Sequence, residues 1–210
     1  MRRASVIKLA LVVAYAALIA WHQPLRGPLS EDEVRAAFGA QFAQIRQSED
    51  AEAQAFLGFF LEDDGRAFFM VNLNALPEQT PEVKTAARQY GLFMMTRLLP
   101  RASYPVMSTD VITSLTNSLA ANLAPFERVV VVRYRSRRDF LEIVTSPAFR
   151  QELSNKTASL DGWSSAPSTA GPLFSLPVFV LLLMLLVPAL YRSIPRRKRP
   201  DQKALDFKTH

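Results

Sequence analysis

The sequence predicts a mixed α+β domain carried between two membrane-spanning helices. Three observations predict it: a nineteen-residue uncharged segment lies near the C-terminus, a shorter apolar segment follows a basic N-terminus, and helical periodicity alternates with short apolar runs between them. With 210 residues, 49% of them hydrophobic, the chain has the composition of a folded protein. It contains no cysteine, which excludes a disulfide framework and a thiolate metal site. Its seven scattered glycines form neither of the common glycine-rich nucleotide loops.

Residues 1–26 are predicted to form an N-terminal membrane anchor. An apolar run over residues 9–21 follows two arginines and a lysine, and it is short for a span unless Val6 and Ile7 join it and Lys8 extends its ammonium to the headgroups. A cleaved signal peptide is the alternative. The run ends at Trp21, however, where the cleavage pattern requires a small residue, and Trp is typical of the membrane interface. We therefore expect an uncleaved signal anchor.

Residues 173–191 are predicted to form a transmembrane helix. This uncharged segment would measure about 28 Å as a helix, which matches a bilayer core of about 30 Å. The alternative, a buried core helix, would need an amphipathic stripe that the segment lacks. Residues 168–172 are the expected linker before the helix, and residues 192–210 are the expected cytoplasmic tail.

The charges predict the orientation of both apolar segments. Residues 1–25 carry three Lys or Arg and no acidic residue, and residues 192–210 carry seven Lys or Arg and two Asp. The stretch between them has 15 basic and 17 acidic residues. By the positive-inside rule both termini face the cytoplasm and the middle is extracytoplasmic, as expected for a bacterial inner-membrane protein. The net charge of +6 thus belongs to the membrane flanks, and we expect membrane lipid rather than nucleic acid as its partner.

Residues 27–66 are predicted to form a helical extension. Ser30 and Glu33 make a capping box, and the apolar residues that follow recur at intervals of three and four. A second short helix is expected over residues 50–60. The acidic turn at residues 62–65 is a weak candidate for a metal or acid–base site, but it lacks the ligand spacing of a calcium loop, and we assign no metal to it.

Residues 67–167 are predicted to contain four strands. Residues 67–73 and 128–134 are short apolar runs rich in aromatic and β-branched side chains. Residues 104–107 are expected to form an edge strand, because Pro105 has no backbone N–H to donate to a neighbouring strand. Residues 160–167 supply the last strand.

Two helices alternate with these strands. Thr80 caps a helix that Pro100 ends, and Ser136 caps a second helix that restarts at Ser146. Residues 109–124 are expected to be a loop with a helical piece. The resulting order, strand, helix, strand, strand, helix, strand, is the ferredoxin-like βαββαβ pattern.

Three motifs in this region resemble those of the dimeric α+β-barrel superfamily. Met-Val-Asn-Leu stands at residues 70–73, a valine-rich strand followed by Arg-Tyr-Arg-Ser lies within residues 127–140, and Ser-Pro-Ala-Phe stands at residues 146–149. The chain is most similar there to domain of unknown function family 1330, over residues 67–167, although Arg135 replaces the usual proline. The resemblance implies a ferredoxin-like monomer whose sheet pairs with a second sheet in a homodimer. It implies no particular reaction, because the superfamily holds monooxygenases, isomerases, haem enzymes and binding modules.

Five residues form the candidate ligand site that this fold implies. We expect the first and third strands to be adjacent and parallel, so that their C-terminal ends meet at one edge of the sheet. That edge would hold Asn72, Asn74, Arg133, Tyr134 and Arg135. Because side chains alternate along a strand, Arg133 and Tyr134 should face opposite sides. The site would bind an anion or polarise a carbonyl; the alternative is a hydrogen-bonded strand edge that fixes the dimer.

The leading functional hypothesis is an uncharacterised membrane-anchored protein whose extracytoplasmic domain dimerises or binds a small molecule, without a cofactor. The alternative is a cofactor-independent monooxygenase or isomerase-type enzyme acting on a small organic substrate. In that enzyme Arg133 would polarise a carbonyl, and Tyr134 or Asn72 would orient the substrate. A third hypothesis makes the two spans a binding surface for another membrane complex. Arg137, on the first turn of the following helix, is expected to be exposed and to contribute little.

Overall fold

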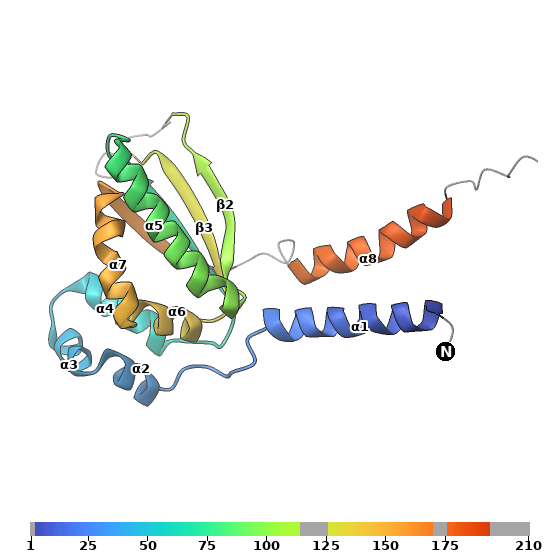
Figure 1. The fold of residues 1–210 in the computed structure, drawn as a ribbon. Helices are drawn as coiled ribbons and strands as arrows, with labels where there is room; N and C mark the ends of the chain where they lie inside the picture. Colours follow the sequence, from blue (N-terminus) through green and yellow to red (C-terminus); the bar gives the residue numbers. More distant parts are fainter. Residues whose placement is uncertain (1–2, 114–125, 170–175, 194–210) are drawn as a thin grey trace, which may run out of the picture. The chain divides into compact units, whose positions relative to one another are not determined.

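The structure, a computed structural model, describes residues 3–113, 126–169 and 176–193 (Figure 1). The loop expected at residues 109–124 and the tail at residues 192–210 therefore lie largely outside the described residues. The chain divides into two compact units, Met1–Phe174 and Ser175–His210. The first contains the α+β domain.

Both terminal apolar segments are helical, as expected. They form α1 (Arg3–His22) and α8 (Leu176–Ser193). Among the residues that the structure describes, none of the helices meets the combined length and hydropathy required to cross a bilayer.

Three short helices make up the predicted helical extension, and their bounds are α2 (Glu31–Phe38), α3 (Ala40–Gln47) and α4 (Ala51–Leu61). The predicted capping box is confirmed: the Ser30 hydroxyl accepts from the Glu33 amide, and the Glu33 carboxylate accepts from the Ser30 amide. The apolar periodicity had predicted one continuous helix across α2 and α3. Gly39 separates the two because its φ of +57° is a left-handed conformation that ends the first helix.

A four-stranded antiparallel sheet lies at the centre of the domain, with strands β1 (Phe68–Ala75), β2 (Tyr104–Asp110), β3 (Arg128–Tyr134) and β4 (Gly162–Ser168). The strand order is β2-β3-β1-β4. The predicted edge position of the second strand is thus confirmed, and a register shift follows Pro105 in it.

The expectation that the first and third strands run parallel is wrong. β1 and β3 pair antiparallel, so that Phe68 lies opposite Tyr134 and Asn74 lies opposite Arg128. The reason is the connectivity: the helix after β1 returns the chain so that β2 runs parallel to β1, and β3 then reverses the direction of β2. The C-terminal end of β1 therefore meets the N-terminal end of β3.

Helices cover one face of the sheet, as Figure 1 shows for α5 and α7. Their bounds are α5 (Pro81–Leu98), the short 3₁₀ helix η1 (Leu99–Arg101), α6 (Arg137–Val144) and α7 (Pro147–Ala158). With the second helix divided into α6 and α7, the predicted order of strands and helices is confirmed.

The core lies between this helical layer and the sheet, and aromatic rings dominate it. Phe68 and Tyr134 stack across β1 and β3 with ring centroids 5.1 Å apart, and Phe140 packs edge-on against both rings. Phe60 of α4 stacks on Phe140 at 5.8 Å, which joins the helical extension to the same core. Fully buried aromatic side chains contribute about 1.5–3 kcal/mol each, so this cluster dominates the packing of the domain.

We call the opposite side of the sheet the open face. The alternation predicted from the sequence separates it from the core: Tyr134 and Met70 point to the helices, and Arg133 points away from them. On the open face of the central strands Phe69 is buried, whereas Val71, Leu73, Val129 and Val131 are only half-buried. Its residues on β1, β2 and β3, read from the register, are Phe69, Val71, Leu73, Tyr104, Met107, Thr109, Val129, Val131 and Arg133.

Candidate functional site

Four arginines lie within six residues at the junction of β3 and α6, and we call them the arginine run: Arg133, Arg135, Arg137 and Arg138. β3 ends at Tyr134, and the Ser136 hydroxyl accepts a 3.1 Å hydrogen bond from the Asp139 amide to begin α6. This sharp change from strand to helix spreads the four guanidiniums in different directions. Each of them contacts a segment from the N-terminal third of the chain.

Arg133 is buried on the open face, with 4% of its surface exposed. Its Nη1 donates to the Ala102 carbonyl at 2.7 Å, and its Nη2 donates to the His22 carbonyl at 3.1 Å. The guanidinium also lies 5.7 Å from the centre of the Tyr104 ring. Burial lowers the pKa of Arg133, although the guanidinium stays charged. Two carbonyls and an aromatic ring thus supply the partners that a buried cation requires.

His22, the residue that follows the apolar run of α1, completes this contact. Its Nδ1 lies 3.3 Å from the Arg133 Nη2, and its Nε2 lies 3.1 Å from the Tyr104 hydroxyl. A guanidinium only donates, so Nδ1 must accept, and the ring proton of the neutral imidazole lies on Nε2. Burial, and next the charge of Arg133, lower the pKa of His22 to about 4. The imidazole is therefore neutral in this arrangement.

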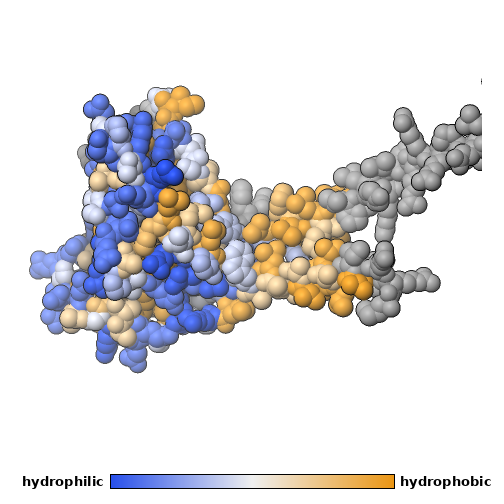
Figure 2. All heavy atoms as spheres, in the orientation of Figure 1, coloured by the Kyte–Doolittle hydropathy of each residue, from blue (hydrophilic) through white to orange (hydrophobic). Residues whose placement is uncertain are grey.

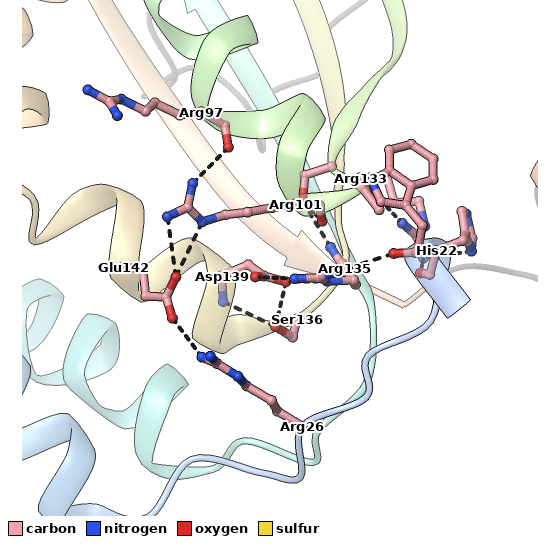
Figure 3. Close-up of polar contacts among 12 residues, drawn as sticks. His22, Arg26, Arg97, Arg101, Arg133, Arg135, Ser136, Asp139 and Glu142 are labelled. Atoms are coloured by element: carbon pink, nitrogen blue, oxygen red, sulfur yellow. Dashed lines mark hydrogen bonds and ion pairs between the residues drawn. The ribbon is translucent and has the colours of Figure 1, made fainter. Parts of the chain in front are cut away.

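Arg135 binds the residue of α1 that precedes His22. Its Nη1 donates to the Trp21 carbonyl at 3.3 Å, while its Nε and Nη2 donate to the two oxygens of Asp139 at 2.8 and 2.7 Å. The hydrogen bonds to Asp139 raise the pKa of Arg135. Figure 3 shows Arg133 and Arg135 reaching the end of α1 together. Cations that bind the last carbonyls of a helix stabilise it, because those carbonyls lack partners and carry the negative end of the helix dipole.

The other two arginines bind the helical extension. Arg137 donates to the carbonyls of Phe59 and Glu62 at 2.6 and 2.7 Å and stacks on the Phe59 ring, so it caps the end of α4. The expectation that Arg137 is exposed is therefore wrong: its side chain is 19% exposed, since α4 packs over the first turn of α6.

Arg138 binds the start of the extension. It donates to the Pro28 carbonyl at 3.1 Å and to the Glu33 carboxylate. The hydrogen bond from Arg138 is the main reason why the pKa of Glu33 falls to about 2. Arg138 thus links α6 to the capping box of α2, and the arginine run as a whole connects residues 21–62 to the sheet.

Glu142 adds a second tie beside the end of α1. Arg26, in the loop after α1, contacts it at 3.1 Å, and Arg101 of η1 contacts its other oxygen at 3.3 Å (Figure 3). Arg26 is 74% exposed and Glu142 41% exposed, so this pair contributes less than the buried contacts of Arg133.

The structure separates the five residues of the predicted ligand site. Asn72 and Asn74 lie toward the opposite end of β1 from Arg133 and Arg135, because β1 and β3 are antiparallel. Asn72 donates to the Val130 carbonyl at 3.1 Å and accepts from the Ser165 hydroxyl at 2.8 Å.

Tyr134 lies in the aromatic core, and burial raises its pKa. Only the two arginines come together, on the end of α1. His22 and Tyr104, which complete their contact, were missed because they lie 111 and about 30 residues from Arg133 and form no local motif.

The acidic turn has a structural role in this arrangement. Asp63 accepts from the amides of Leu29 and Gly65 at 2.8 and 3.0 Å, which fixes the loop before α2. Within the described residues no group of three or more acidic or histidine side chains is placed to hold a metal ion. A shallow hollow of about 420 Å³ lies at Phe42, between Arg35 and Arg46, away from the arginine run.

No family model and no curated protein matches the chain. The chain is similar to the crystal structure of RPA0582, a protein of unknown function from Rhodopseudomonas palustris, at 18% identity, over 57% of this chain and 94% of that chain, with a TM-score of 0.48. It is similar to the structure of methylated RPA0582 at 16% identity, over 58% of this chain and 93% of that chain, with a TM-score of 0.49. At these identities the likeness says nothing of function.

Proposed function

We propose that the chain is a membrane-anchored protein of the bacterial inner membrane whose extracytoplasmic domain associates with a second copy of itself. Support for the anchoring comes from the uncharged run at residues 173–191, the apolar run at residues 9–21 and the basic residues that flank them. The large apolar side chains of α1 and α8 also stay exposed to solvent, including Val12 at 63% and Leu185 at 62%. Figure 2 colours the described parts of both helices mostly hydrophobic.

The apolar residues of the open face are the main support for the proposed association of two copies. Both central strands present apolar residues there that are only half-buried, and Met107 on the edge strand is 46% exposed. Val71, Leu73, Val129 and Val131 form an apolar strip across the two central strands, and a strip of this kind is typical of a surface that a partner covers. The partner we propose is the same face of a second copy, which would bury both apolar surfaces at once in a two-fold arrangement.

The domain type agrees with this proposal. A sheet in the order β2-β3-β1-β4, with helices on one face, is what a ferredoxin-like domain requires, and pairing of two such sheets would make a dimeric α+β barrel. Membrane lipid and a second copy are then the partners of the chain. A small-molecule ligand of the assembled dimer is a further part of the proposal.

The contacts of Arg133 favour a structural role for this residue over a catalytic one. An enzyme that polarises a carbonyl with Arg133 needs its guanidinium donors free to meet a substrate. In this chain those donors bind the carbonyls of Ala102 and His22, and the guanidinium is buried. The same contacts favour a role in holding α1.

The test is the mass of the full chain in detergent, measured by light scattering across a range of concentrations. We expect the parent protein to be a dimer and Met107→Glu to shift it toward monomer, because a carboxylate would enter an apolar interface. Leu92→Glu is the matched control, since Leu92 is 58% exposed on α5, in the helical layer. A monomeric parent, or equal effects of the two substitutions, would contradict the proposal.

A further inference from the structure

The last turn of α1 reaches the open face through contacts in which a neutral histidine is required. His22 is 3% exposed and touches both Arg133 and Tyr104, which come from neighbouring strands. Trp21 contributes its carbonyl to Arg135 in the same place. We call these contacts of Trp21 and His22 with Tyr104, Arg133 and Arg135 the α1 latch.

The hydrogen bonds of the latch depend on the protonation state of His22. Nδ1 can accept from Arg133 only while it carries no proton, because the guanidinium has no acceptor to offer in return. Protonation would therefore remove that hydrogen bond and place a cation 3.3 Å from the guanidinium.

No carboxylate contacts the His22 ring in the described residues to offset this repulsion. The titratable and charged groups near the ring are Tyr104 of β2, Arg133 of β3 and Arg135, which follows β3. The carboxylate that joins this network through Arg135, that of Asp139 on α6, already binds the Arg135 guanidinium through both oxygens. The surroundings of the imidazole are thus polar or cationic on each strand that it touches.

We infer that the α1 latch is a proton-sensitive switch: neutral His22 holds the end of α1 on the sheet, and protonated His22 releases it, which uncovers Arg133 and Tyr104 at the edge of the open face. This inference rests on the proposed function for its setting, because an extracytoplasmic domain follows the external pH. The low pKa of His22, about 4 against 6.5 for the free side chain, agrees with the geometry. Release should therefore develop as the pH falls from 6.5 toward 4.

The chain is suited to a direct measurement of this release. It has no cysteine, so that cysteines introduced at the exposed positions Gln23 and Gln89 can be spin-labelled without background. Labelled full-length chains diluted into unlabelled protein in detergent then report only distances within one chain. We expect one narrow distance distribution at neutral pH and a broad one at the acidic end, with far-UV circular dichroism unchanged.

Two further variants assign the transition to His22. His210→Ala leaves His22 as the sole histidine, so that NMR of histidine-labelled protein follows its protonation directly. We expect protonation and the change in distance to share one midpoint, and His22→Gln, which cannot be protonated in this range, to lose the transition.

Protonation without a change in distance would overturn the switch, as would the same transition in His22→Gln. Loss of the circular dichroism signal at the same midpoint would overturn it too, because the event would then be unfolding of the whole domain. The light-scattering mass of the same samples reports dimerisation separately, so a failure of the proposed function is distinguishable from a failure of the switch.

Discussion

Arg135 holds both carboxylate oxygens of Asp139 with two donors and the Trp21 carbonyl with a third. The pair is four residues apart, across the strand-to-helix junction, and Asp139 is only 5% exposed. Asp139 also accepts from the Ser136 hydroxyl, so that one carboxylate orients both the cap of α6 and the arginine that reaches α1.

Replacing Asp139 by Asn should therefore loosen two contacts at once. The amide keeps the shape of the side chain but loses the charge and one acceptor, which leaves a half-buried guanidinium donor of Arg135 unsatisfied. We expect the free energy of unfolding to fall by about 1–3 kcal/mol. Chemical denaturation of the full chain measures this, with Asp110→Asn as the control, since Asp110 forms a mostly exposed pair with Arg128. Equal effects of the two substitutions would show that the pair of Arg135 and Asp139 contributes no more to stability than a surface ion pair.

Arg133→Ala should destabilise the domain because it leaves the carbonyls of Ala102 and His22 without their donor. We expect a loss of about 1–3 kcal/mol in the free energy of unfolding. Arg133→Lys should recover only part of it, since one ammonium cannot reproduce the planar geometry that reaches both carbonyls. Full rescue by lysine would mean that the charge alone matters.

Arg137→Ala should also lower the midpoint temperature of thermal unfolding, whereas the same substitution of an exposed arginine should leave it nearly unchanged. It removes the cap of α4 and the contact with the Phe59 ring. Arg66→Ala is the matched control, because its side chain is 84% exposed and lies 3.9 Å from Asp64. Thermal denaturation of both variants decides between the two roles, and an unchanged midpoint for Arg137→Ala would count against the cap.

The capping box should make the free energy of unfolding depend on pH in the acidic range, through the protonation of Glu33. The pKa of Glu33 is about 2 in the folded chain, below its ordinary value of 4.5, so the unfolded chain binds more protons between these two values. The contribution of Glu33 is therefore present above pH 4.5 and is lost as the pH falls toward 2. Glu33→Gln should flatten the slope of stability against pH in this window. An unchanged slope would show that Arg138 does not distinguish the two protonation states.

The proposed topology can be tested with a reporter that is active only outside the cytoplasm. Fused after Thr169 it should be active, and fused after Lys208 it should be inactive, because the seven basic residues of the tail should stay in the cytoplasm. Activity at both positions would contradict the two-span arrangement.

The local patterns of the sequence predicted the elements well and their relative direction poorly. Residues 128–134 were predicted to the residue, because four consecutive valines between a charged residue and a cap leave few alternatives to a buried strand. The division at Gly39 was missed because apolar periodicity continues through it. The direction of β3 relative to β1 depends on how the chain returns from β2, which no local pattern encodes.

The candidate site shows the same limit. The alternation along β3 correctly placed Arg133 and Tyr134 on opposite faces. What Arg133 contacts depends on His22, 111 residues earlier, and a histidine at the end of an apolar run resembles any interfacial residue in the sequence. Four arginines within six residues were the available signal, but the sequence analysis predicted ligand contacts for Arg133 and Arg135 and an exposed position for Arg137, and not the contacts of all four with N-terminal segments.

The arginine run has a consequence for the order in which the protein is made. The carbonyl of His22 accepts from Arg133, which the ribosome adds 111 residues later. At a translation rate of roughly 5–20 residues per second, that interval lasts roughly 5–20 s. During this time α1 and the extension are synthesised but have none of the four guanidiniums that bind them. A ribosome that stalls before residue 133 would thus leave α1 and the helical extension without these donors and accessible to proteases. A ribosome that continues from residue 133 to residue 138 adds all four arginines of the run within about a second.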